Sequence, residues 1–176
     1  MAMIDALLAE LEQESHATRR VLERVPQAHL GWKPHAKSMS LGQLALHVAT
    51  VPGNVAELAS MDTIPEPPAF VQREAATAAE LVPALTASVA KARQHLGGFD
   101  DAAMRATWRL MSGGREVMAM PRVAFARAIM LNHWYHHRGQ LMVYLRLLDV
   151  PVPSVYGPSA DENPFAAIPA GGGGPR

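Results

Sequence analysis

Three of the eight histidines in this 176-residue chain lie within five consecutive positions, in the segment LNHWYHHRGQL at residues 131–141. His133 and His137 are four residues apart. On a helix this spacing stacks two side chains one turn above each other, with Cβ atoms about 5–6 Å apart, so both imidazoles can bind one metal ion. His136 falls about 100° round the helix from His137, on the flank. The pair alone is a weak signal, because HxxxH occurs by chance in many helices.

A third histidine, His47, is in phase with the apolar positions of a separate predicted helix, three residues after Leu44 and four before Val51. Helical bundles build metal sites from side chains on facing helices. Three neutral imidazoles leave coordination positions open, which is typical of a catalytic rather than a structural zinc site. The sequence therefore predicts a metal centre at His47, His133 and His137, and it assigns no catalytic base.

The composition limits what such a centre can contain. The chain has no cysteine, so a metal must rest on nitrogen and oxygen ligands. The second nitrogen of each ligand is expected to donate to a carboxylate or a carbonyl, and Glu57, Asp161 and Glu162 are candidates that the sequence does not place. The plainer alternative is that the histidines are hydrogen-bonded core residues. Four other histidines are interpreted as structural or solvated: His16, His29, His35 and His95.

The charge and hydropathy of the chain exclude two classes of partner. Lys plus Arg and Asp plus Glu are both 16, so the formal net charge is zero, which disfavours nucleic-acid binding. No apolar run of about 18 residues and no basic leader segment is present. We expect a cytoplasmic protein with no membrane contact.

Four predicted helices must position these histidines. Ser40 and Gln43 form a capping box at the start of the second helix, and Pro52 is expected to leave the Val48 carbonyl without its helical donor and to kink that helix. Gly113-Gly114 predicts the turn of a small hairpin within residues 107–120. The helices are expected at residues 3–25, from 40 onward, 77–96 and 121–149, with loops at 27–39 and 62–76.

The fourth predicted helix places His133 and His137 on its core-facing side, because they continue an apolar stripe with three- and four-residue spacing. That stripe is Val123, Ala126, Met130, His133, His137, Leu141, Tyr144 and Leu148. The predicted fold is all-α, a four-helix bundle with long crossover connections and one small β-hairpin. It forms one domain over residues 1–165, followed by a Pro/Gly-rich tail at 166–176.

Two long motifs, GWKPHAKSMSLGQLALHVA and LNHWYHHRGQLMVYLRLL followed by VPVPSVYGPSADE, resemble the DinB/YfiT-like superfamily of metal-dependent enzymes, in its DinB-type branch. The resemblance covers roughly residues 1–165. It implies a four-helix bundle in which a histidine triad holds nickel, zinc or iron, and the triad carries over onto His47, His133 and His137. It also implies a homodimer.

The resemblance further implies a reaction class. Related proteins transfer low-molecular-weight thiols such as bacillithiol and mycothiol, or isomerise maleylpyruvate with a thiol cofactor. The expected function is therefore a divalent-metal-dependent hydrolase or low-molecular-weight-thiol transferase that acts on a small molecule. The alternative is a non-catalytic dimer that binds a metal or a small ligand.

Overall fold

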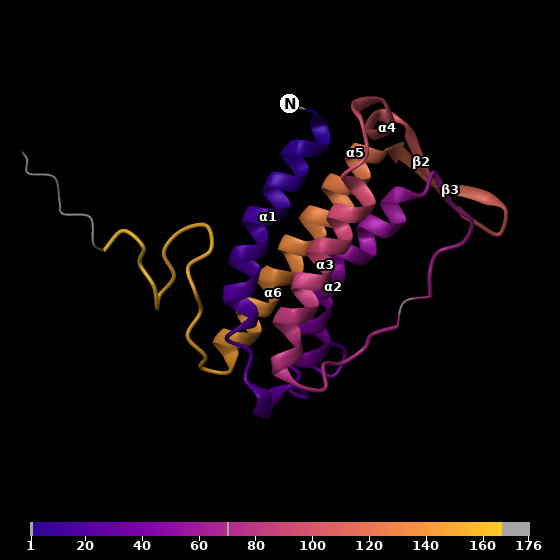
Figure 1. The fold of residues 1–176 in the computed structure, drawn as a ribbon. Coiled ribbons are helices and arrows are strands. Elements are labelled where there is room, and N and C mark those ends of the chain that lie inside the picture. The colour runs from indigo at the N-terminus through magenta and orange to yellow at the C-terminus, as the bar shows by residue number, and fades with distance from the viewer. Residues whose placement is uncertain (1, 70, 167–176) are drawn as a thin grey trace, which may run out of the picture.

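The computed structural model describes residues 2–69 and 71–166 and is mostly helical, with a small three-stranded sheet. Helices α1, α2, α3 and α6 lie side by side, and the β2–β3 hairpin projects beyond one end of them (Figure 1). The helices are α1 (Met3–Leu22), α2 (Leu41–Ser60), α3 (Leu81–Leu96), α4 (Asp101–Arg105), α5 (Arg122–Phe125) and α6 (His133–Leu147). Two short 3-10 turns precede α2 and α3, η1 (Gln27–His29) and η2 (Ala78–Glu80).

A π-helical segment, η3 (Ala126–Asn132), joins α5 to α6. The residues at both junctions, Phe125 and Asn132, have right-handed helical backbone angles, so α5, η3 and α6 form one continuous rod. The sequence predicted this rod as a plain α-helix over residues 121–149. The prediction missed the π segment, which is a rare geometry that commonly occurs near functional sites.

The π segment changes which side chains face the core. Met130 and Leu141 are buried as predicted, but between them the buried positions are Leu131, Trp134 and Arg138, while His133 and His137 are only partly buried. Because η3 closes its hydrogen bonds from residue i to i+5, it adds a residue to the turn and rotates the following positions by about 100°. The prediction that both histidines lie on the core face is therefore only partly correct: they lie at the edge of the core, next to the buried Trp134 and Arg138.

Helix α2 begins as the sequence predicts. The Ser40 hydroxyl accepts from the Gln43 backbone N–H at 3.1 Å, and the Gln43 side chain accepts from the Ser40 N–H at 2.9 Å, which confirms the capping box. The helix then continues through Pro52 to Ser60. At Gly53 the backbone N–H donates to the Ser88 hydroxyl of α3 at 2.8 Å, and a Cβ there would lie 2.8 Å from the Ser88 carbonyl oxygen. Glycine is needed at this close contact between α2 and α3.

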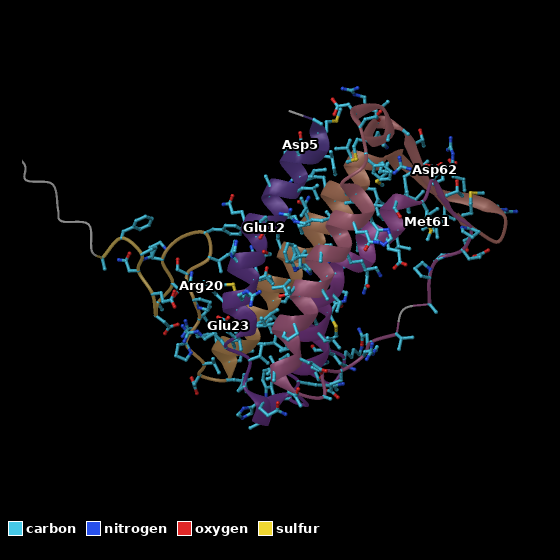
Figure 2. All side chains as sticks on the ribbon, viewed as in Figure 1. Asp5, Glu12, Arg20, Glu23, Met61 and Asp62 are labelled. Atoms are coloured by element: carbon cyan, nitrogen blue, oxygen red, sulfur yellow. The ribbon has the colours of Figure 1, made fainter. Side chains whose placement is uncertain are left out.

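The sheet contains β1 (Thr63–Ile64), β2 (Thr107–Ser112) and β3 (Arg115–Pro121). Strands β2 and β3 form the predicted antiparallel hairpin, and Gly113 and Gly114 at its turn have φ values of 54° and 75°. Strand β1 pairs parallel with β2 and was not predicted, since it lies in a segment that the sequence indicates as a loop. Asp62 lies next to β1 (Figure 2), and its carboxylate binds the guanidinium of Arg122 at the start of α5.

The chain after α6 lies against α1 and α6. The Glu162 carboxylate accepts from Arg20 and Arg24 of α1, and the Asp161 carboxylate accepts from Arg146 of α6. The segment therefore has specific contacts up to this point, although the sequence predicts no regular structure in it. Most of the predicted 166–176 tail, residues 167–176, lies outside the described residues.

Candidate metal centre

His47 of α2 meets His133 and His137 of α6, and one ligand nitrogen from each ring lies within 4.8 Å of the other two. The Nε2 atoms of His47 and His133 are 3.3 Å apart. Two nitrogens bound at 2.0–2.1 Å to one tetrahedral zinc ion would be about 3.3–3.4 Å apart. This pair thus has the separation that a shared ion requires, and among residues 2–69 and 71–166 the triad is the only group of three or more potential ligands with such geometry.

The surroundings of the three imidazoles favour the neutral form of each ring. Burial, followed by the nearby His137 and His133, lowers the pKa of His47 from 6.5 to about 4. Burial is also the main cause that lowers the pKa of His133 and of His137. A neutral imidazole offers a free lone pair to a metal, whereas a protonated one does not.

Two of the rings are oriented by oxygen acceptors on their own helical rod. The Nδ1 atom of His137 lies 2.7 Å from the side-chain oxygen of Gln140, and the His133 ring hydrogen-bonds the backbone of Ile129, one turn earlier. With Nδ1 of His137 engaged in this way, its Nε2 is left for an ion. For His137 the contact confirms the expectation that a carbonyl oxygen faces the second nitrogen.

The carboxylates suggested by the sequence have other partners. Glu57 accepts from Lys91 at 2.6 Å, while Asp161 and Glu162 bind the arginines described above. Gln140 takes the orienting role instead at His137. Its position three residues after His137 is a signal that the sequence does contain, because residues three apart on a helix are neighbours.

Trp134 links the two helices beside the triad. Its indole is fully buried, and Nε1 donates to the Val48 carbonyl oxygen at 2.8 Å. Val48 is the residue whose carbonyl loses its helical donor at Pro52, so the indole N–H replaces the missing backbone N–H. The bond joins the residue after His47 to the residue after His133 and fixes the two backbones relative to each other.

The half-buried position of the rings follows from the π segment and affects access. Trp134 and Arg138 occupy the core positions, so His133 and His137 lie at its edge. His136 is exposed, and its ring centroid is 5.0 Å from that of His137, in agreement with its predicted place on the flank. An ion at the triad would be reachable from solvent, as an open catalytic site requires.

No helix within residues 2–69 and 71–166 is both long and apolar enough to cross a membrane. No curated protein sequence matches the chain.

Comparison with known proteins agrees with the resemblance of the motifs. The family model described as DinB family matches residues 1–166. A crystal structure of a DinB-like protein from Bacillus cereus ATCC 10987 is 23% identical, with a TM-score of 0.64, covering 89% of this chain and 100% of that chain. A DinB-like protein from Bacillus subtilis is 17% identical, with a TM-score of 0.63, covering 85% of this chain and 97% of that one. The chain belongs to the DinB family.

Proposed function

We propose that the protein is a divalent-metal-dependent enzyme in which a bundle of four helices holds one ion through His47, His133 and His137. The observation that supports this proposal is the convergence of three neutral imidazoles from two helices on one point. Imidazole ligands suit nickel, zinc and iron alike. The proposed ion is therefore one of these three.

The proposed chemistry is either hydrolysis or transfer of a low-molecular-weight thiol to a small-molecule substrate. A bound ion would lower the pKa of a water ligand toward neutrality or hold a thiol as its thiolate. The residues of the chain would bind the ion and orient the rings that hold it. His137 and His133 keep their tautomers through Gln140 and Ile129, and Trp134 fixes α2 against the rod. We propose that the active protein is a homodimer.

Metal content tests the proposed ligand set. Protein purified without chelators is expected to contain about one transition-metal ion per chain, measured by elemental mass spectrometry, because three imidazoles form a complete protein ligand set for an open site. His47→Ala, His133→Ala and His137→Ala should each lose the ion. His136→Ala is the matched control, since His136 is an exposed neighbour outside the triad. This variant should retain the ion. Wild-type protein that retains no ion would overturn the proposal.

Turnover separates an enzyme from a binder. Metal-loaded protein is assayed with esters and amides for hydrolysis, and with thiols plus electrophilic acceptors for transfer. Loss of the turnover in His133→Ala together with retention in His136→Ala supports catalysis at the triad. A bound ion with a fourth protein ligand and no turnover would support the alternative, a metal-binding dimer without catalysis.

A further inference from the structure

An apolar hollow of about 180 Å³ lies between α2, the rod and the sheet. Helix α2 contributes Leu58, the rod contributes Phe125 and Ile129, and the hairpin contributes Leu110 and Met118. All of the side chains that line the hollow are apolar. A bound water would need polar partners, so the hollow suits a hydrocarbon group.

The hollow and the histidine triad lie next to each other along α2 and the rod. Leu58 follows His47 by eleven residues, which is three turns, on the same face of α2. On the rod, Ile129 lines the hollow and its backbone also receives the hydrogen bond from His133. One wall residue of the hollow is thus in direct contact with a ring of the triad.

Helix α2 and the rod run in opposite directions, so the residues of the hollow and those of the triad face each other in the same order along both. At one end, Arg122 of the rod donates to the Ala59 carbonyl at 2.7 Å; at the other, the Tyr144 hydroxyl donates to the Met39 carbonyl at 3.3 Å. The helices therefore run antiparallel. Leu58 of α2 lies opposite the start of the rod, and the triad lies further along the same contact.

The size and charge of the hollow define its occupant. A dry apolar cavity of about 150 Å³ takes a molecule of benzene, so this hollow fits a phenyl ring or a short alkyl chain. Ile129 and His133 are about one helical turn apart and are joined by a hydrogen bond between the Ile129 backbone and the His133 ring, so a linker of a few bonds spans the distance between them. On the hairpin, Arg109 and Glu116 neutralise each other at 2.7 Å and provide no net charge for a charged group.

We propose that the hollow binds the apolar group of a substrate whose polar end reaches the metal at His47, His133 and His137. This inference rests on the proposed function and specifies the substrate class: a small molecule with a phenyl-sized or short alkyl group and, a few bonds away, a metal-binding group.

The test uses Co²⁺-loaded protein and straight-chain alkylhydroxamates from acetohydroxamate to octanohydroxamate, with binding followed by the visible absorption of Co²⁺. Each added methylene should tighten the Kd about threefold to fourfold until the hollow is full, since burying one CH₂ contributes about 0.8 kcal/mol. Met118→Trp fills the hollow and should abolish the dependence on chain length while acetohydroxamate still binds. The matched control is Val117→Trp, on the exposed neighbouring residue of β3, and it should keep the dependence.

A second measurement does not need the metal. Toluene titrated into the metal-free protein should shift the NMR signal of the Trp108 indole N–H, because Trp108 lines the hollow. The same titration of Met118→Trp should leave that signal in place. Trp108→Phe identifies the signal.

The outcomes separate this inference from the proposed function. Acetohydroxamate binding without any dependence on chain length would overturn the apolar subsite and leave the metal enzyme standing. Failure to bind Co²⁺ would overturn both. An unchanged chain-length dependence in Met118→Trp, with a changed sedimentation coefficient, would mean that a second copy of the chain covers this face, and would also overturn the inference.

Discussion

His47 is half-buried beside two other imidazoles, and its pKa falls to about 4 as a result. Protons and metal ions compete for the same lone pairs, so a low pKa leaves the ligand free for a metal over a wider range of pH. Each ring also repels the charged form of its neighbours. Binding of one divalent ion to the cluster is therefore favoured over protonation of several of its rings.

The metal-free protein should lose stability as pH falls from 6.5 toward 4. In this window the unfolded chain protonates His47 at its ordinary pKa, while the folded chain keeps it neutral, so acid favours unfolding. Above pH 6.5 the contribution is fully present. Thermal unfolding of metal-free wild type and His47→Gln at pH 7 and pH 5 measures the effect, and the variant should show the smaller fall in Tm. An equal fall in both proteins would show that His47 is protonated in the folded state.

Gln140 should control metal affinity through His137. Removal of a group that orients a metal ligand typically weakens metal binding about 10- to 100-fold, and we expect Gln140→Ala to lie in this range. Gln140→Glu keeps an oxygen acceptor and should restore affinity. Competition with a chromophoric chelator gives the Kd. Gln13→Ala, at an exposed position on α1, serves as control. If Gln140→Ala and Gln13→Ala bind the metal with equal affinity, Gln140 has no role in metal binding.

At the scale of elements, the rod shows how far the sequence could predict the site. The triad was recognisable because His47, His133 and His137 recur at helical spacing on two separate helices. Their place at the edge of the core was not recognisable, because the stripe was continued across Ala126–Asn132 with α-helical periodicity. The extra residue in that π turn is set by packing and has no distinct composition. It placed Trp134, rather than His133, in the core.

The same limit applies to the sheet and to the helix ends. Capping residues such as Ser40 and the turn at Gly113-Gly114 act locally, so the sequence predicted them. Strand β1 has only two residues, Thr63 and Ile64, and pairs with a strand more than forty positions away. Its hydrogen bonds depend on how the long loop is placed by the rest of the chain, which local patterns do not encode.

The indole of Trp134 should stabilise both the fold and the metal site. Trp134→Phe leaves the buried Val48 carbonyl without a donor, which costs about 1–3 kcal/mol, and frees α2 to move relative to the rod. We expect a lower midpoint of urea unfolding and a weaker Co²⁺ affinity. Trp108→Phe is the matched control, since Trp108 donates to the Leu58 carbonyl at 3.0 Å, and it should lose stability but keep its metal affinity. Equal metal affinities in the two variants would contradict the role of Trp134.

At the scale of the whole molecule, buried arginines join elements that are distant in sequence. Arg138 is 2% exposed and binds the Glu14 carboxylate of α1 at 2.7 Å. It also donates to Tyr156 of the C-terminal segment, whose hydroxyl donates to Glu14 at 2.9 Å. Removing one partner of a buried ion pair leaves an uncompensated charge. The network therefore ties α1, α6 and the C-terminal segment into one unit.

The outer part of the C-terminal segment should be detachable without loss of the fold. Glu162 accepts from Arg20, Arg24 and the Ser154 backbone, and Arg20 of α1 lies beside this segment (Figure 2). Exposed ion pairs contribute about 0–1 kcal/mol each, so Glu162→Gln should leave the Tm nearly unchanged. The opening of the segment should become more frequent, because Glu162 is the group that links Arg20 and Arg24 of α1 to the Ser154 backbone of the segment.

Limited proteolysis measures this opening. Glu162→Gln should be cleaved several-fold faster within residues 150–166 than wild type, with the metal affinity unchanged, because the segment docks on α1 and α6 while the triad lies where α6 meets α2. Glu23→Gln, at the end of α1, is the control and should be cleaved at the wild-type rate. A fall in Co²⁺ affinity in Glu162→Gln would instead couple the C-terminal segment to the metal centre, through Arg138, whose helix α6 also holds His137.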